Sequence, residues 1–311
     1  MTIRPLNLTD LKTSVSDAHE RGEKVTGIDL GALDRILAHS PEDLTVTVES
    51  GITLARLQAE LARRSQWLPI DPPNPEQLTV GALLAINASG PRRYGCGMIR
   101  DHLIGIKVVL ADGRLVKSGG KVVKNVAGYD LARLFIGSYG SLGVIAEATF
   151  KLRPLPEAES FIQADYRTLE EAEGSIASLL DSELTPVVLD LHNLSTRNIP
   201  VLVLGFAGSR EEVDWQLEKA RELGLKEPAG LDYEKRFWSD EAPAQWLSVL
   251  PSQTVETLGR LGNTSFVARA GNGVIYHRGA TGQRKNDLPV KLARRLKKAF
   301  DPKQILPDLP L

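Results

Sequence analysis

Hydrophobic positions along the chain recur with two periods, which predict a mixture of helices and strands. Apolar residues between positions 8 and 18 follow helical spacing and lead to Gly22, so we expect a helix that stops there. Residues 44–48 alternate between apolar side chains and threonine, as a half-buried strand does. Leucines at positions 54, 57 and 61 lie on one face of another predicted helix, with Thr53 as its candidate N-cap.

The pattern changes after Arg153, where a proline-marked segment is the best candidate for a domain boundary. Before it, two predicted strands are joined by the turn Asp112-Gly113, a hairpin signal. Beyond it, two strand–helix units and an added strand predict a small ferredoxin-like α+β lobe. Its expected elements are strands at 161–166, 187–191 and 201–206, and helices opened by capping boxes at Thr168–Glu171 and Ser209–Glu212.

The final part of the chain predicts three further features. Residues 238–258 are expected to be partly helical, with Trp246 in the core, and residues 270–277 combine a glycine turn with a strand. Residues 291–301 form a basic amphipathic helix stopped by Pro302. The charge run of this helix indicates a solvated or subunit-facing surface.

Composition narrows the functional classes. The 311 residues are 42% hydrophobic and 25% charged, as in an ordinary globular protein, and the net charge of −1 gives no reason to expect nucleic acid or an anionic membrane. A single cysteine, Cys96, excludes internal disulfides and cysteine-based metal sites. The polar start of the chain and the lack of a long apolar run predict a cytoplasmic protein, free or peripherally docked.

Two segments carry candidate binding chemistry. Gly137, Gly140 and Gly143 lie within seven residues and run into a β-branched strand, so the turn can fold closely around a ligand, although it fits neither the Walker A nor the Rossmann spacing. Residues 81–88 place small side chains along a short helix, which lets either a flat ring system or a neighbouring backbone approach.

These segments carry a resemblance. Residues 66–153 resemble the FAD-binding domain of the p-cresol methylhydroxylase/vanillyl-alcohol oxidase type, and within that group they are most similar to the FAD-binding E subunits of bacterial glycolate oxidases. The matching motifs are L-P-I-D-P-P at 68–73, T-V-G-x-x-x-A-x-N-A-S-G at 79–90, I-R-D-H-L-I-G at 99–105, and the whole of residues 118–153.

The resemblance implies non-covalent FAD and a set of cofactor contacts. Lys124, Asn125, Tyr129 and Asp130 fall in its loop motif, where Tyr129 and Asp130 are expected to pin the loop. The wider group attaches flavin through Cys or His in some members, but not at the motif that holds Cys96. The implied cofactor-binding residues are Pro73, Thr79, Val80, Gly81, Asn87, Ala88, Ser89, Gly90, Arg100, Asp101, Gly140, Leu142, Gly143, Val144 and Ile145.

The sequence departs from the family between Gly22 and Leu30. Only seven residues stand where the family has a strand and a glycine-rich turn that cradles the FAD pyrophosphate. One interpretation is that a compact loop replaces this element and other contacts hold FAD. The other is that the flavin site is crippled and the protein has become structural.

The arginines and histidines of the sequence do not identify the catalytic residues. Arg92, Arg93 and Arg100 could face phosphates or a substrate carboxylate, or lie on the surface with Asp101 as a partner. The five histidines show no metal-ligand spacing, and we expect His192 and His277 to be structural. No catalytic base can be identified, and no metal site is expected.

We therefore expect an α+β protein. A two-subdomain FAD-binding domain of the vanillyl-alcohol oxidase type, with a shortened N-terminal subdomain, occupies residues 1–154. A ferredoxin-like cap lobe with the substrate pocket follows over 155–265, and a C-terminal return segment and helix complete the chain over 266–311.

The expected function is that of an FAD-binding subunit in a multi-subunit glycolate (2-hydroxy acid) oxidase or dehydrogenase. Its partners would be a D-type flavoprotein and an iron–sulfur F-type subunit, and its flavin would accept electrons from the hydroxy acid or from the partner flavoprotein. The alternative is a non-catalytic scaffold of the same complex that has lost or weakened FAD binding. A stand-alone FAD oxidoreductase would need catalytic residues that the sequence does not reveal.

Overall fold

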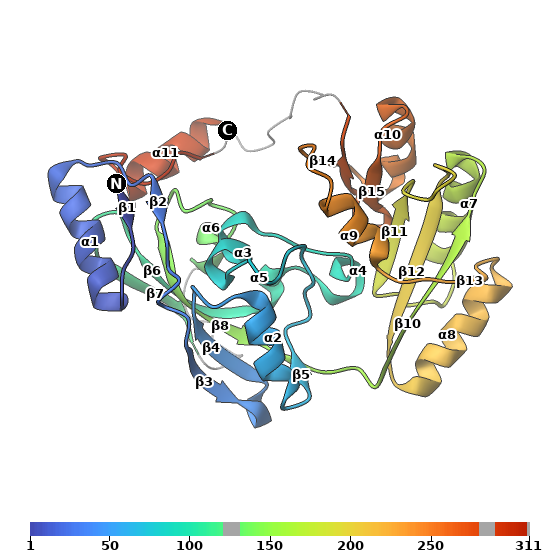
Figure 1. Ribbon diagram of the computed structural model, residues 1–311, viewed down its shortest axis with the longest axis horizontal. Coiled ribbons are helices and arrows are strands. Elements are labelled where there is room, and N and C mark those ends of the chain that lie inside the picture. The colour runs from blue at the N-terminus through green and yellow to red at the C-terminus, as the bar shows by residue number, and fades with distance from the viewer. Residues whose placement is uncertain (121–130, 280–289, 310–311) are drawn as a thin grey trace.

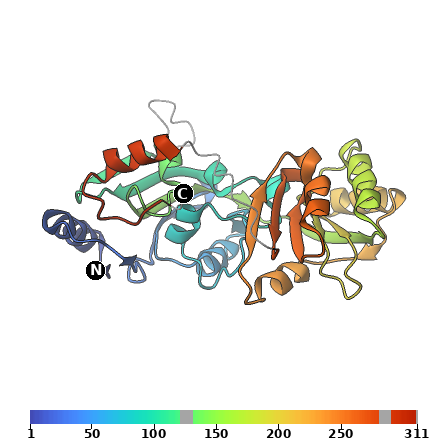
Figure 2. The ribbon, with the colours of Figure 1, turned by 90° about the horizontal axis from the view of Figure 1, so that it is seen from above.

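The computed structural model describes residues 1–120, 131–279 and 290–309. Two lobes lie side by side along the long axis of the molecule, and they remain separate when the view is turned by 90° (Figures 1 and 2). The first lobe is built on a five-stranded sheet and the second on a seven-stranded sheet. Within the described ranges, no helix has the length and apolar character needed to cross a membrane.

The first lobe combines an antiparallel sheet in the order β3-β4-β8-β6-β7 with helices and two small strand pairs. Its elements are β1 (Thr2–Ile3), α1 (Leu8–Arg21), β2 (Gly27–Ile28), β3 (Ile36–Ser40), β4 (Thr45–Glu49), α2 (Leu54–Ala62), β5 (Gln66–Trp67), α3 (Val80–Ile86), α4 (Arg93–Cys96), α5 (Ile99–His102), β6 (Leu103–Val109), β7 (Leu115–Gly119), α6 (Ala132–Phe135), β8 (Val144–Lys151) and β9 (Arg153–Pro154).

Local sequence signals account for the helix ends of this lobe. Helix α1 stops at Gly22, whose φ of 65° lies in the left-handed region that glycine adopts without strain. Thr53 and Thr79 cap α2 and α3 by accepting hydrogen bonds from backbone amides three residues on. Asn87 ends α3 with a φ of 52°. The predicted helix over 8–22, strand over 44–48 and hairpin around Asp112-Gly113 are confirmed.

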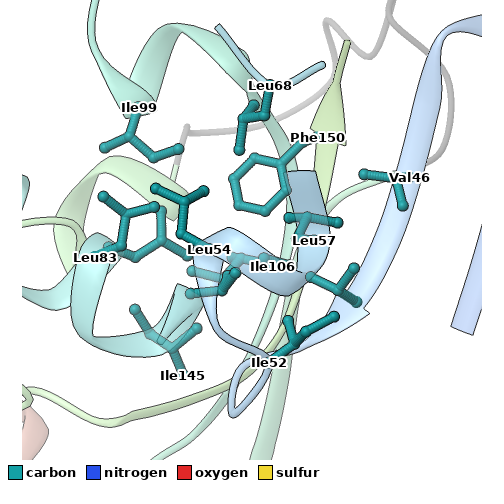
Figure 3. Packing of buried hydrophobic residues seen from close by; sticks show 14 of the residues in the cluster. Val46, Ile52, Leu54, Leu57, Leu68, Leu83, Ile99, Ile106, Ile145 and Phe150 are labelled. Carbon is teal, nitrogen blue, oxygen red and sulfur yellow. The ribbon is translucent and has the colours of Figure 1, made fainter. Parts of the chain in front are cut away.

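The core of this lobe lies between the five-stranded sheet and helices α2 and α3. Figure 3 shows side chains from the sheet, such as Val46, Ile106 and Phe150, converging on Leu57 of α2 and Leu83 of α3. Each of these five residues is at most 4% exposed. Their burial fixes α3, and with it the segment that the sequence assigns to the cofactor.

The second lobe contains the predicted ferredoxin-like arrangement. Its sheet has the order β13-β10-β12-β11-β15-β16-β14, and the first four strands with α7 and α8 form the β-α-β-β-α-β unit. Its elements are β10 (Ala158–Asp165), α7 (Leu169–Leu180), β11 (Val188–His192), β12 (Val201–Gly208), α8 (Arg210–Glu222), β13 (Glu227–Pro228), α9 (Asp232–Trp238), β14 (Gln245–Ser248), α10 (Thr254–Leu261), β15 (Phe266–Arg269) and β16 (Val274–His277).

Two expectations for this lobe were wrong. Strands β15 and β16 pair within its sheet, so residues 266–277 belong to this lobe and not to the C-terminal return segment. Trp246 lies on β14 at the sheet edge and is 43% exposed, so it is not a core residue. Both errors arose because strand pairing across the lobe is not visible in the local pattern.

The chain returns to the first lobe with helix α11 (Val290–Phe300). This helix lies beside the first lobe in both ribbon views, although it follows the second lobe in sequence (Figures 1 and 2). Its Phe300 meets Phe135 of α6 edge to face, with ring centroids 5.9 Å apart. Beyond the helix, Ile305 and Leu306 are buried against α1 residues, which completes the core on that side.

Candidate cofactor site and lobe junction

The structure brings the small-residue helix and the glycine turn together, although about fifty residues separate them in the chain. The amide of Gly137 donates to the carbonyl of Leu84, and the amide of Tyr139 donates to that of Ala85, each over 2.9 Å. The turn is tight, because Gly137, Tyr139 and Gly140 all have positive φ. The two motifs therefore form one corner at the C-terminal end of α3.

This corner has unsatisfied polarity and open space beside it. The side-chain oxygen of Asn87 is buried and has no hydrogen-bond partner among the described residues. A Cβ on Gly137 would lie 3.6 Å from the Cβ of Asn87, so the amide borders the turn. A Cβ on Gly140 would meet no atom within 4 Å. An orphaned amide oxygen beside an open backbone fits a polar ligand such as part of a dinucleotide.

Three other predicted glycines are explained by packing within the protein. A Cβ on Gly81 would lie 3.0 Å from Ser50 Cβ, one on Gly90 would lie 1.9 Å from the carbonyl oxygen of Asp71, and one on Gly143 would lie 2.6 Å from a methyl of Val108. These glycines allow chain segments to approach one another. Their presence therefore does not by itself indicate a ligand.

Most of the other predicted side chains are committed to the protein. Val80, Leu142, Val144 and Ile145 are at most 5% exposed and pack in the hydrophobic clusters, and Ala88 packs against one of them. Any cofactor contact at these positions has to use the backbone.

The predicted polar residues have local roles. The Thr79 hydroxyl caps α3, and Ser89 Oγ accepts from Arg93 Nη1 over 3.4 Å. A carboxylate oxygen of Asp101 accepts the amide of Met98 at the start of α5 over 2.8 Å. The exposed Arg100 has its Nε 3.8 Å from Asp101. Neither member of that pair joins the corner formed by Asn87 and the glycine turn in any contact of the described residues.

The short connection between α1 and the first sheet offers no amide cradle for a pyrophosphate. Val25 N donates to the carbonyl of Ile305 over 2.7 Å, Thr26 N to that of Met1 over 2.8 Å, and Asp29 N to that of Ile3 over 2.9 Å. These amides are taken up by the protein itself. The residues present thus fit a cofactor at the corner beside α3 but not at this connection.

A groove of about 770 Å³ lies at the lobe junction. Its walls are mainly apolar and include Trp67, Pro72, Pro73 and Leu155 on one side and Leu231 and Trp238 of the second lobe on the other. Pro73 is the one predicted cofactor residue that lines it. The structure therefore separates Pro73 from the corner that collects Asn87 and the glycine turn.

Arg92 joins the two lobes at the edge of this groove. Its guanidinium binds Glu159 of β10 through two hydrogen bonds of 2.7 and 2.6 Å and Asp71 of the first lobe through one of 2.7 Å. Burial raises the pKa of the Asp71 carboxyl, and the neighbouring Arg92 opposes that shift. Because Arg92 is fully paired, it is a structural clamp and not a free cation for a phosphate or a substrate. Of the two interpretations of Arg92, the one that placed it on the surface with Asp101 as its partner was wrong.

A buried charge network under α9 escaped the sequence analysis. Arg269, which is 2% exposed, contacts the buried carboxylate of Asp190 and binds Glu234 over 2.7 Å. Asp190 also accepts the hydroxyl proton of Tyr233 over 2.6 Å, and Trp238 Nε1 donates to Glu234 over 3.0 Å. The charges come from three segments of the second lobe, and only the fold brings them together.

His192, His277 and Cys96 are all buried side chains. His277 and His192 are 1% and 6% exposed, and burial lowers the pKa of His192 to about 4; their structural role stays a prediction. Cys96 is buried, and burial raises the pKa of its thiol. No cluster of potential metal ligands occurs in the described ranges. Lys124, Asn125, Tyr129 and Asp130 lie outside them.

Comparison with known proteins supports the resemblance read from the motifs. Residues 5–119 match the family model of the FAD binding domain. The chain is 38% identical over 159 residues to glycolate oxidase subunit GlcE of Escherichia coli, covering 50% of this chain and 45% of that protein. It is 35% identical over 158 residues to glycolate oxidase subunit GlcD of Bacillus subtilis, covering 51% of this chain and 34% of that protein.

A third relative extends the match into the second lobe. The probable mitochondrial D-lactate dehydrogenase of Danio rerio is 30% identical over 227 residues, covering 68% of this chain and 44% of that protein. The chain thus spans less than half the length of these relatives.

The fold as a whole has a solved counterpart. Alkyldihydroxyacetonephosphate synthase superposes with a TM-score of 0.73 at 18% identity, covering 98% of this chain and 75% of that one. This likeness extends over both lobes and confirms the predicted fold class.

Proposed function

We propose that the protein is an FAD-binding subunit of an oxidoreductase complex that acts on a small 2-hydroxy acid, since residues 5–119 match the family model of the FAD binding domain. The observation that carries the proposal is the similarity to both GlcE and GlcD glycolate oxidase subunits over about half of the chain. The similarity to a D-lactate dehydrogenase points to the same substrate class, since glycolate and lactate are both 2-hydroxy acids.

The corner beside α3 would hold part of the cofactor. The orphaned amide oxygen of Asn87 can accept a hydrogen bond, and the open backbone at Gly140 lets a ligand approach closely. When bound, FAD would supply the acceptor for the two electrons that a 2-hydroxy acid gives up on oxidation to the 2-oxo acid. The protein's own part would be to bind and orient the cofactor.

Two features favour a subunit over an independent enzyme. The histidines of the second lobe that could act as bases, His192 and His277, are buried and engaged with neighbouring backbone amides. The groove at the lobe junction has its charged residue Arg92 paired with carboxylates, so this cation does not offer itself to a substrate carboxylate. We infer that a D-type flavoprotein completes the active complex together with an iron–sulfur subunit.

A second candidate function rests on the connection after α1. Since the amides of Val25, Thr26 and Asp29 donate within the protein, the pyrophosphate of FAD would lack the contacts that the family provides there. A protein with this change could serve as a scaffold of the same complex with weakened FAD binding. The two candidates make opposite predictions for the purified protein.

The test is the visible spectrum of the purified protein, followed by acid precipitation. A flavin spectrum that moves to the supernatant supports non-covalent FAD, and bleaching on addition of glycolate or D-lactate with the partner subunits supports the substrate class. A variant with Asn87→Gly keeps the left-handed backbone without the amide, and its affinity for FAD should fall. A folded protein that takes up no flavin after reconstitution, but still co-purifies with partner subunits, would establish the scaffold.

A further inference from the structure

The segment that follows α11 lies between the short connection after α1 and the glycine turn. Ile305 and Leu306 are at most 2% exposed and pack in the cluster that contains Val25 and Val144. The carbonyl of Ile305 accepts the amide of Val25 in the short connection after α1. The C-terminal segment therefore occupies the side of the lobe where the shortened connection ends.

Lys297 of α11 reaches from this segment to the glycine turn. It is 9% exposed, and its ammonium lies 2.7 Å from Asp301 Oδ2, 2.9 Å from the carbonyls of Leu306 and Pro307, and 3.0 Å from the carbonyl of Ser141. An ammonium has three protons, so these four oxygens saturate it. A lysine this buried is stable only when its charge is compensated in this way.

Asp301 provides the compensation and fixes the segment. It is fully buried, its Oδ1 accepts the amide of Ile305 over 3.0 Å, and its Oδ2 accepts that of Leu306 over 2.8 Å. The Lys297–Asp301 pair thus holds the C-terminal loop in place by contacts within the C-terminal segment itself. The carboxylate of Asp301 already neutralises the charge of Lys297. The further hydrogen bond from Lys297 to the carbonyl of Ser141 therefore has another role.

Ser141 lies in the middle of the glycine turn. Its amide and hydroxyl both bind the carbonyl of Ser138, over 3.0 and 2.6 Å, which leaves its own carbonyl pointing to Lys297. On its other side the turn is held by the amides of Gly137 and Tyr139 against α3. Lys297 is therefore the second anchor of the turn, next to the open backbone of Gly140.

We propose that Lys297 is a positioning residue of the cofactor site, which holds the turn from Gly137 to Ile145 in its ligand-binding conformation through the carbonyl of Ser141. This inference rests on the proposed function, because it takes FAD as the ligand of the turn. It assigns to the C-terminal segment a role in binding that neither the motifs of the first lobe nor the match over residues 5–119 includes.

The experiment measures the FAD dissociation constant of the apoprotein by flavin fluorescence for the wild type, Lys297→Met and Lys298→Met. Lys298 is the exposed neighbour on the same helix, so its variant controls for the loss of one charge. We expect K297M to weaken FAD binding by at least about tenfold, comparable to one lost charge-assisted hydrogen bond, and K298M to leave it unchanged. Competition by AMP and by riboflavin should show that K297M loses affinity for one half of the cofactor and keeps the other.

The outcomes separate this inference from the proposed function. A wild type that binds FAD while K297M binds equally well would overturn the role of Lys297 and leave the function intact. An equal loss for both halves of the cofactor would overturn it as well, because a merely destabilised protein loses both. A folded wild type that never binds FAD would overturn the proposed function itself.

Folding of the variant is controlled by a second design. If K297M leaves Asp301 unpaired and does not fold, K297M/D301N replaces the ion pair by neutral side chains of similar size. K298M, which loses one charge on the same helix and keeps the contact from Lys297 to Ser141, is the matched reference. The same FAD measurement on this pair supports the proposal if only the double variant binds weakly, and overturns it if both bind alike.

Discussion

Replacing Arg269 by methionine tests whether the buried charge network holds the second lobe together. In the native protein the guanidinium faces the carboxylates of Asp190 and Glu234, which are 0% and 8% exposed. Methionine fills a similar volume without a charge. The substitution would leave two buried carboxylates that, among the described residues, keep the Tyr233 hydroxyl and the Trp238 indole as partners.

The expected loss is large. Removing one partner of a buried ion pair costs about 3–5 kcal/mol, because the remaining charge stays buried without compensation. For a lobe of this size, a loss of that magnitude lowers the melting temperature by about 10–15 °C at an estimated 3 °C per kcal/mol. Circular dichroism melts of wild type and R269M at pH 8 would measure it.

The pKa of Asp190 determines how the stability loss in R269M should change with pH. Burial raises the pKa of Asp190 to about 7 even though Arg269 opposes the shift, and without Arg269 it would rise further. In the unfolded chain the carboxyl titrates near its ordinary pKa of about 3.9, so between the two values the folded state binds more protons. The stability contributed by this group is present at low pH and is lost as the pH rises through the folded pKa.

The deficit of R269M should therefore be greatest at pH 8 and shrink at pH 5, where protonation neutralises the stranded carboxylate of Asp190. Arg260→Met is the control, since Arg260 is 72% exposed and pairs with Glu256 on the surface of the same lobe. Its melting temperature should change little, because exposed pairs contribute at most about 1 kcal/mol. A deficit of R269M below about 1 kcal/mol, or one of equal size at both pH values, would refute this account of the network.

Two further predictions concern packing and the lobe junction. Gly90→Ala should destabilise the protein by about 3 kcal/mol or more in denaturant titrations, because the new Cβ would lie 1.9 Å from the Asp71 carbonyl oxygen. Gly174→Ala, at an exposed position of helix α7, should stabilise it by up to about 1 kcal/mol. Equal effects of the two substitutions would contradict the packing argument. Arg92→Met should lower the free energy of unfolding by about 2–4 kcal/mol and split calorimetric unfolding into two transitions, while Glu159→Gln should have a smaller effect. A single unchanged transition for Arg92→Met would show that Arg92 does not couple the lobes.

Local signals in the sequence determined much of the fold. Helix ends at Gly22, Thr53 and Thr79 depend on backbone groups within a few residues, so the chain itself encodes them. The ferredoxin-like unit could be predicted because two capping boxes and alternating strands appear in a regular order. The motifs around Asn87 and Gly140 likewise carried the resemblance to FAD-binding proteins, since they are continuous in sequence.

Only the tertiary structure decided how these residues are used. It showed that Gly81, Gly90 and Gly143 are required by packing, while Gly140 borders open space and the amide oxygen of Asn87 is buried without a partner among the described residues. It also showed that Arg92, which the sequence groups with Arg93 and Arg100, is paired with two carboxylates at the lobe junction. It also joined residues that no local pattern connects.

Lys297 and Ser141 lie 156 positions apart, and Asp190 and Arg269 lie 79 apart. The reason is physical: a helix cap or a turn is satisfied by neighbours in the chain, whereas a buried charge is satisfied by whatever group the fold places within about 3 Å, and a single sequence does not state that distance.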